Sequence, residues 1–299
     1  MRRALALCLT IALAAPALAG RDVFDRVKSA FADDAGVRIH YCALGRRGPL
    51  VVFVHGFPDF WYGWREQMAG LSRHHRVVAL DLRGYNLSDH PAGVESYALS
   101  ALVEDVAAVI RATGESRATI VGHDWGGAIA WLFAILHPEM TERLVVLQTP
   151  HPRGLLRELR TNPAQRQAST YVDAFLANDP HAFVTPGFFA VTAKDPDVRR
   201  RYDEAFARSD VDAMIDYYRA NYPRPPYDDI VLPNVQAPVL VIHGTADPFL
   251  LTVGHNSTWD FVDGPLTIRT IPGAGHFVQA ERPAEVTKIL KDWLDPPRR

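Results

Sequence analysis

The chain has 299 residues, of which 48% are hydrophobic and 22% are charged, and its formal net charge is −2. This composition is typical of a soluble globular protein that is long enough to bury a large core. Because the net charge is small and no long run of one sign occurs, there is no electrostatic reason to expect binding to nucleic acid or to a bilayer surface.

The first residues have the layout of an export signal. Two arginines precede an apolar run over 4–15, and the small-residue triplet ALA follows at 17–19. A buried N-terminal helix is the alternative, and the run is too short to span a bilayer. We expect residues 1–19 to be a signal peptide and the mature protein to be periplasmic or secreted. Cleavage would remove Cys8 and leave only Cys42, so no internal disulfide could form.

Strand-like and helix-like patterns then alternate along the chain. An alternating pattern or a nearly continuous apolar run, each typical of strands, occurs at 37–44, 50–56, 77–84, 118–124, 143–150, 238–244 and 266–273. Helical patterns occur at 61–72, 100–113, 126–136 and 284–294, and Ser100 is the expected N-cap of the second. This order predicts an α/β fold with a mostly parallel, twisted sheet flanked by helices.

The alternation is interrupted between about 150 and 232. This segment has helical patterns, many aromatic residues and the Pro-rich stretch YPRPPYDD, but no buried-strand run. We interpret it as a helical cap inserted between two halves of one sheet. The predicted organisation is a first core part at 20–149, the cap at 150–232 and a second core part at 233–299.

The stretch GHDWGG places Asp124 between an expected strand and an expected helix. Small neighbours are what a sharp strand-to-helix turn needs to hold one side chain above the edge of a sheet. A helix-capping role is the alternative for Asp124. Two partners favour the functional interpretation, because Asp247 and His276 each follow a later expected strand. Nucleophile, acid and histidine in this order are typical of α/β-hydrolases.

Six motifs occur in a characteristic order: HGFPDFWYGW, DLRGYNLSD, GHDWGG, QTPHP, HGTADPF and GAGHF. With them the chain resembles the epoxide hydrolases of the α/β-hydrolase fold and their dehalogenase relatives, over the whole mature chain. Asn86 departs from the pattern, since the family usually has Gly at that position, and we expect an altered local turn there.

The resemblance implies further parts of a site. Backbone N–H groups of Phe57 and Trp125 would form an oxyanion hole, and Phe57, Pro58, Trp125 and Phe277 would line an apolar substrate pocket. We expect His55 to be a structural hydrogen-bonding residue beneath the site and not a catalytic base.

An aspartate nucleophile suits an electrophilic saturated carbon. A carboxylate is already ionised at neutral pH, so Asp124 can attack directly and form an alkyl ester. His276, oriented by Asp247, would then activate water to hydrolyse that ester. An esterase or peptidase function is disfavoured, because those enzymes use the histidine to activate a hydroxyl or thiol nucleophile.

Two tyrosines of the expected cap, Tyr171 and Tyr218, resemble the paired lid tyrosines of epoxide hydrolases. Their O–H groups could donate to the epoxide oxygen and then protonate it. Packing within the cap is the alternative role. Tyr217 is the residue most easily mistaken for Tyr218, because the two are adjacent.

Two other functions remain open. A haloalkane or haloacid dehalogenase would use the same nucleophile, but haloalkane dehalogenases usually have Asn or another N–H donor where Phe57 stands. Fluoroacetate dehalogenases have Arg where Trp125 stands. A noncatalytic secreted binding protein on the same scaffold is the second alternative. Gln148 occupies the position of the acid in some relatives, but an amide cannot stabilise an imidazolium as a carboxylate does.

The expected reactants are a small apolar epoxide and water, which would give a vicinal diol. The sequence contains no CxxC, HExxH or Walker motif, so we expect no metal and no organic cofactor. We expect no nucleic-acid partner and no membrane association after signal cleavage, and a homo-oligomer remains open.

Overall fold

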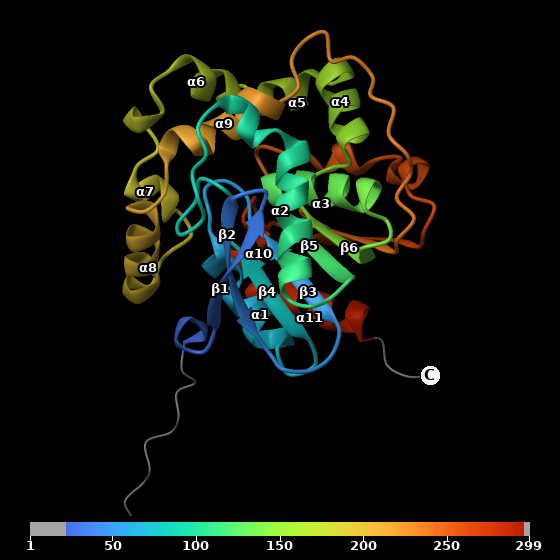
Figure 1. The fold of residues 1–299 in the computed structure, drawn as a ribbon. Coiled ribbons are helices and arrows are strands. Elements are labelled where there is room, and N and C mark those ends of the chain that lie inside the picture. Colours follow the sequence, from blue (N-terminus) through green and yellow to red (C-terminus); the bar gives the residue numbers. More distant parts are fainter. Residues whose placement is uncertain (1–21, 296–299) are drawn as a thin grey trace, which may run out of the picture.

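The core is an eight-stranded sheet, seen in a computed structural model that describes residues 22–295 (Figure 1). The strand order is β1-β2-β4-β3-β5-β6-β7-β8. The strands are β1 (Lys28–Asp34), β2 (Val37–Leu44), β3 (Leu50–Val54), β4 (Arg76–Leu80), β5 (Ala118–His123), β6 (Thr141–Leu147), β7 (Val239–Gly244) and β8 (Leu266–Ile271). β2 pairs antiparallel with β1 and β4, and all other neighbouring strands are parallel. The mostly parallel sheet confirms the predicted fold class.

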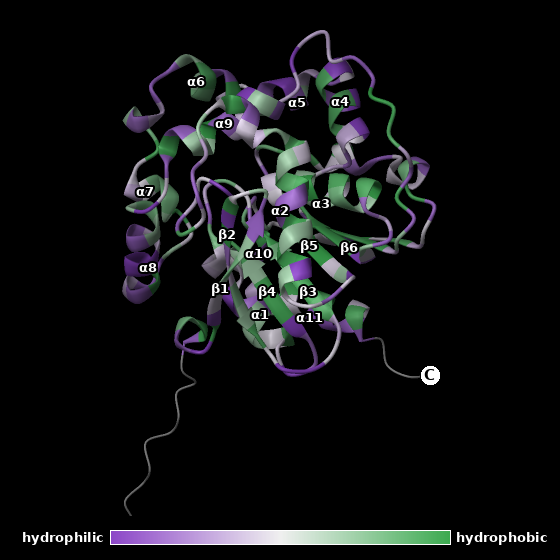
Figure 2. Cartoon of the chain, viewed as in Figure 1, coloured by the Kyte–Doolittle hydropathy of each residue, from purple (hydrophilic) through white to green (hydrophobic). Residues whose placement is uncertain are grey.

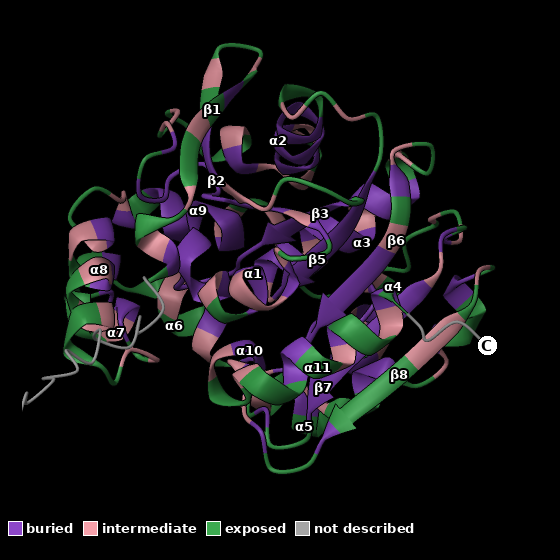
Figure 3. Cartoon of the chain, turned by 90° about the horizontal axis from the view of Figure 1, so that it is seen from below, coloured by how far each residue is buried: buried purple, intermediate pink, exposed green. Residues whose placement is uncertain are grey.

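Helices flank the sheet. α2 packs beside α3 on one face, and α1 packs beside α11 on the other (Figures 1 and 3). The core helices are α1 (Arg65–Leu71), α2 (Leu99–Ala112), α3 (Trp125–Leu136), α10 (Val278–Glu281) and α11 (Pro283–Leu294). Short 3-10 helices lie at Val23–Asp25, Trp61–Trp64, Val94–Tyr97, Pro180–Ala182, Thr252–His255 and Thr258–Phe261.

The central strands have the composition that burial on both faces requires. Every residue of β3, β5 and β7 is buried, and most of them are apolar (Figures 2 and 3). Burying one Val, Leu or Ile side chain stabilises the fold by about 1.5–3 kcal/mol. β8 lies at the edge of the sheet, and three of its six residues are exposed.

The segment between β6 and β7 is helical. It contains α4 (Pro152–Thr161), α5 (Pro163–Ala168), α6 (Tyr171–Ala177), α7 (Pro186–Phe189), α8 (Pro196–Phe206) and α9 (Val211–Asn221). α4, α5, α6 and α9 lie above the sheet in Figure 1, and α7 and α8 lie at its side. The predicted helical cap is therefore present, while its exact boundaries at 150 and 232 stay predictions.

Buried hydrogen bonds fasten the cap to the core. The hydroxyl of Tyr202 in α8 donates to the Asp59 carboxylate at 2.8 Å. The hydroxyl of Tyr217 in α9 donates to the carbonyl oxygen of Arg83, also at 2.8 Å. Because a buried donor without an acceptor costs free energy, these bonds favour one position of α8 and α9 over the core.

Two local features differ from the sequence-based expectations. Ser100 is not an N-cap: α2 begins at Leu99, and its N-cap residue, Ala98, has no side chain that can accept. The Leu99 N–H is instead satisfied by the side-chain oxygen of Asn221, at 2.8 Å, from the end of α9. β1 was not predicted, because Ala32 is its only fully buried residue and its sequence lacks an apolar stripe.

Cys42 and Asn86 were singled out from the sequence, and the structure describes both. Cys42 is buried with a free thiol. Asn86 has φ +47°, the left-handed region that Gly adopts at little cost and Asn tolerates better than most residues.

The expected signal peptide at 1–19 lies outside the described residues and stays a prediction. Within 22–295, no helix is both long enough and apolar enough to cross a membrane.

Candidate active site

Asp124 lies on a sharp turn between β5 and α3. Its backbone has φ +54°, an uncommon value for a residue with a side chain. A Cβ at Gly122 would collide with the carbonyl oxygen of Gly126, and a Cβ at Gly126 would collide with that of Val54. The predicted need for small neighbours is therefore confirmed, because only glycine permits these close backbone approaches.

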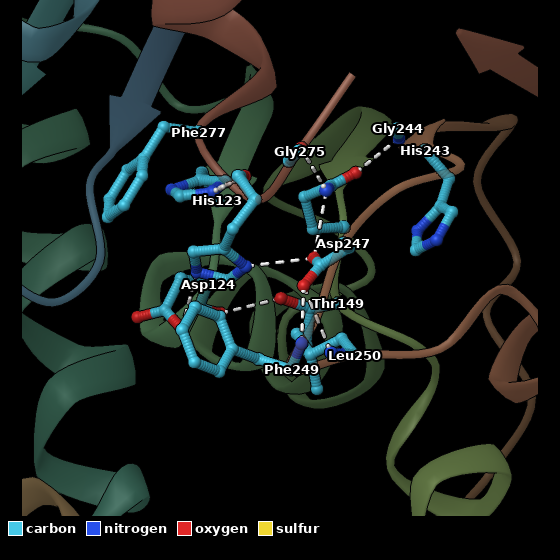
Figure 4. Close-up of polar contacts among 12 residues, drawn as sticks. His123, Asp124, Thr149, His243, Gly244, Asp247, Phe249, Leu250, Gly275 and Phe277 are labelled. Atoms are coloured by element: carbon cyan, nitrogen blue, oxygen red, sulfur yellow. Dashed lines mark hydrogen bonds and ion pairs between the residues drawn. The ribbon is translucent and has the colours of Figure 1, made fainter. Parts of the chain in front are cut away.

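The structure brings Asp124, His276 and Asp247 together just beyond the ends of β5, β8 and β7. Figure 4 shows Asp124 and Asp247 in this group. His276 Nε2 lies 3.4 Å from Asp124 Oδ2, and His276 Nδ1 lies 2.8 Å from Asp247 Oδ2. The three side chains are at most 11% exposed. This is the geometry of a nucleophile, a base and an acid that orients the base.

The charges in this group perturb one another strongly. Burial disfavours the imidazolium of His276, but the Asp247 charge and the hydrogen bonds to Asp124 and Asp247 raise its pKa from 6.5 to about 10. Burial would raise the pKa of Asp124, yet the bond to His276 and the charge of His276 bring it below its ordinary value. At neutral pH the resting site therefore holds an imidazolium between two carboxylates.

Asp124 is also held from the side of β3. The backbone N–H of Phe57 donates to Asp124 Oδ1 at 2.7 Å, so Phe57 lies where the sequence predicted an oxyanion donor. Trp125 begins α3 directly after Asp124, and its role as the second donor stays a prediction. His55 accepts a hydrogen bond from the Leu82 N–H at 3.0 Å and is 1% exposed, as expected of a structural residue.

His276 is anchored through its own backbone. The ring nitrogen Nε2 of His123 lies 2.8 Å from the carbonyl oxygen of His276. Burial and the neighbouring His276 lower the pKa of His123 to about 4, so its ring is neutral and can donate this bond. The loop that carries His276 is thereby fixed to the end of β5.

Gln148 contributes to the site in a way that the sequence did not reveal. Its side-chain N–H groups donate to Asp247 Oδ2 and to the Gly275 carbonyl, each at 2.8 Å, and its oxygen accepts from the Gly244 N–H at 2.6 Å. Gln148 is fully buried and has φ +68°, a strained value for such a residue. It therefore links the loop of the acid to the loop of the histidine.

Tyr171 and Tyr218 face the same space as Asp124, whereas Tyr217 does not. Asp124, Tyr171 and Tyr218 line the same two cavities, which have volumes of about 410 Å³ and about 320 Å³. Burial, followed by neighbouring charges, raises the pKa of both hydroxyls well above the ordinary value for tyrosine. Tyr217 is occupied by its bond to Arg83 and lines neither cavity. The structure therefore favours Tyr218 over Tyr217.

The two cavities differ in character. The smaller one is strongly aromatic and contains three of the four predicted pocket residues, Phe57, Pro58 and Phe277. Besides Tyr171 and Tyr218, three further phenylalanines line it: Phe175, Phe188 and Phe249. The larger one contains Trp125, the fourth, and extends between α4 and the segment 221–230. Together they give the predicted apolar surroundings for a substrate at Asp124.

The same arrangement bears on metal binding. In the described part of the chain, no three or more His, Cys, Asp and Glu side chains are grouped so that they could hold a metal ion.

The chain matches the alpha/beta hydrolase fold family over residues 49–283. It is 34% identical to epoxide hydrolase 3 of Xenopus tropicalis, over 87% of this chain and 76% of that protein. It is 33% identical to the AB hydrolase superfamily protein YfhM of Bacillus subtilis, over 90% of this chain and 99% of that protein. The structure of a variant of a Bacillus megaterium epoxide hydrolase, complexed with its product, a naphthyloxy-propane-1,2-diol, superimposes with a TM-score of 0.80 at 33% identity, over 89% of this chain and 100% of that chain.

Fold and site together define an enzyme of the α/β-hydrolase fold. Within that fold the chain belongs to the epoxide hydrolases, which are hydrolases that act on ether bonds.

The raised pKa of His276 gives a first prediction. In the folded enzyme this pKa is above its value in the unfolded chain, so the stability it contributes is fully present below about pH 6.5 and is lost as the pH rises through about 10. Asp124→Asn removes one of the two carboxylates, and the pKa of His276 should fall. NMR titration of the ring checks this, and an unchanged pKa would contradict the pairing of His276 with Asp124.

Proposed function

We propose that this protein converts an epoxide to a vicinal diol through an ester formed on Asp124. The proposal rests on the arrangement around Asp124. Its carboxylate lies 3.4 Å from His276 and lines the two cavities that Tyr171 and Tyr218 also line. Membership of the epoxide hydrolase family supports it, as does the diol product bound by the B. megaterium relative.

In the first step Asp124 attacks an epoxide carbon. Oδ1 is held by the Phe57 N–H, whereas Oδ2 faces His276 and the site. We therefore assign Oδ2 as the attacking oxygen and Oδ1 as the future carbonyl oxygen of the ester. The low pKa of Asp124 keeps the carboxylate ionised and ready to attack.

Opening the ring leaves negative charge on the epoxide oxygen. Tyr171 and Tyr218 have pKa values well above the ordinary tyrosine value, so both hydroxyls keep their protons at neutral pH. They can donate hydrogen bonds to the epoxide and release a proton as the alkoxide forms, because an alkoxide is a much stronger base than a phenolate.

In the second step water hydrolyses the ester. Ester formation removes the negative charge of Asp124, which is one of the causes of the high pKa of His276. The imidazolium can then lose its proton, which restores the tyrosine that protonated the epoxide oxygen. The neutral imidazole accepts a proton from the attacking water, while Asp247 keeps it oriented, and this proton passes to the diol oxygen as it leaves Asp124. Charge that develops on Oδ1 is stabilised by the Phe57 N–H and, as we propose, by that of Trp125.

A dehalogenase with the same nucleophile is less well supported. Halide release needs N–H donors around the leaving anion, and the side chain of Phe57 provides none. The two tyrosines that face Asp124 instead suit a leaving oxygen that must be protonated. The X. tropicalis and B. megaterium proteins that this chain resembles are epoxide hydrolases, which also disfavours a noncatalytic binding protein on this scaffold.

The ester gives a direct test. His276→Gln should still form the ester but hydrolyse it very slowly, because an amide cannot act as the base. Intact-protein mass spectrometry should show an increase equal to the whole mass of the epoxide, mapped to the Asp124 peptide. The double variant with Asp124→Asn is the control and should give no adduct. An adduct with alkyl halides but none with epoxides would favour a dehalogenase.

The tyrosines can be tested against a neighbouring control. A general acid typically contributes about 10²–10⁴-fold, and Tyr171 would still donate, so Tyr218→Phe should slow ester formation by about 10²-fold. Tyr217→Phe removes the adjacent hydroxyl and its bond to Arg83, and should leave the rate of ester formation near that of the unchanged enzyme. Stopped-flow single-turnover kinetics measure both. Equal losses in the two variants would contradict the assignment.

Gln148 should act as a positioning residue in the second step. Loss of its bond to the buried Asp247 carboxylate costs about 1.5–3 kcal/mol, so Gln148→Leu should slow ester hydrolysis by about 10- to 100-fold and change ester formation little. Gln67→Leu is a matched control, because Gln67 is also a fully buried glutamine but bonds the Gln279 carbonyl. Single-turnover kinetics separate the two steps, and a loss confined to ester formation would refute this role.

A further inference from the structure

A second group of serine, histidine and aspartate lies on the antiparallel side of the sheet. Ser29 Oγ on β1 lies 2.8 Å from His40 Nε2 on β2, and His40 Nδ1 lies 2.6 Å from Asp81 Oδ2. Asp81 follows β4 directly. None of these residues lines the two cavities at Asp124, so the group is separate from the site described above.

The surroundings of Asp81 decide which atom of His40 carries the proton. The carboxylate accepts from the Trp61 N–H at 3.0 Å and from the Asn86 side chain at 2.7 Å, and it is fully buried. With the carboxylate as an acceptor, His40 Nδ1–H donates to it. In the neutral ring, Nε2 is then unprotonated and accepts from the hydroxyl of Ser29.

Asn86 is the residue at which the sequence departs from the Gly usual in the family, and its place here is informative. Its amide group donates to Asp81, and its side-chain oxygen accepts from Nε of Arg208 at 2.9 Å. A glycine could supply neither bond. The substitution therefore adds a donor that fixes the position of the Asp81 carboxylate in this second group.

Exposure distinguishes the possible nucleophiles of the group. Ser29 is exposed, whereas His40 is 1% exposed and Asp81 is fully buried. Cys42 Sγ also lies near His40 Nε2, at 3.9 Å, but the thiol is buried, and burial followed by the charge of Asp81 raises its pKa. Ser29 is thus the most exposed member of the group, and the bond between its hydroxyl and His40 is only part-buried.

We propose that Ser29 is a second nucleophile of this protein, activated by His40 and Asp81, which accepts acyl or phosphoryl groups from small activated electrophiles. A hydroxyl in hydrogen-bond reach of an imidazole, which is itself oriented by a carboxylate, is the arrangement that makes serine nucleophilic. With a fluorophosphonate, the Ser29 Oγ–P bond forms as the P–F bond breaks. The hydroxyl proton passes to His40 Nε2, and fluoride leaves.

Labelling with a fluorophosphonate probe tests the proposal, with the modified serines identified by peptide mass spectrometry over time. Base assistance contributes about 10²–10⁴-fold, so Ser29 should be labelled at least about 10²-fold faster than Ser96, whose hydroxyl donates to the Ala92 carbonyl. Ser29→Ala should remove the fast label and retain epoxide hydrolysis, whereas the matched variant Ser96→Ala should retain both.

His40→Gln should reduce labelling of Ser29 to the rate seen for Ser96, with epoxide hydrolysis as the check that the variant is folded. If His40→Gln does not fold, the labelling rates of Ser29 and Ser96 in the unchanged protein still test the proposal. Equal labelling rates for Ser29 and Ser96 in the folded, unchanged protein would overturn the proposal.

Discussion

The active site depends on one imidazole placed between two carboxylates. His276 lies within 3.4 Å of Asp124 and 2.8 Å of Asp247, with all three side chains largely out of water. Each charge there would be costly alone, because a buried ion without a partner loses its hydration. Together they are mutually stabilising, which lowers the pKa of both carboxyls and raises that of the imidazole. The resting enzyme therefore holds an ionised Asp124 and a protonated His276, and in the proposed reaction His276 must lose its proton before it can act as a base.

The rest of the fold serves to keep those three groups in place. They follow β5, β7 and β8, which are parallel strands of one sheet whose carboxyl ends lie at the same edge, with β6 between β5 and β7. Gly122 and Gly126 allow the turn at Asp124, and Gln148 ties the loop of Asp247 to that of His276. A buried amide suits this linking role, because it can donate to a carboxylate and accept from a backbone N–H without adding charge.

The sequence predicts the parts of this arrangement that depend on chain order and local pattern. Buried strands are mostly apolar and the nucleophile turn needs small residues, so the parallel sheet and Asp124, Asp247 and His276 could be identified before the structure. β1 could not, because a strand at the edge of a sheet need not have a buried stripe. The role of Gln148 and the capping of α2 by Asn221 depend on contacts between residues about 100 or more positions apart, which no local pattern encodes.

The cap matters chemically because burial determines what its tyrosines can do. A solvated tyrosine would lose its proton near pH 10, whereas removal from water disfavours the phenolate and keeps Tyr171 and Tyr218 as donors. Asp124 lines the same cavities, and its negative charge further disfavours ionisation of either tyrosine. In the proposed reaction, attack by Asp124 would move that charge onto the substrate oxygen, beside the two hydroxyls. The group that keeps the tyrosines protonated in the resting enzyme would thus be the group whose reaction creates the base they protonate.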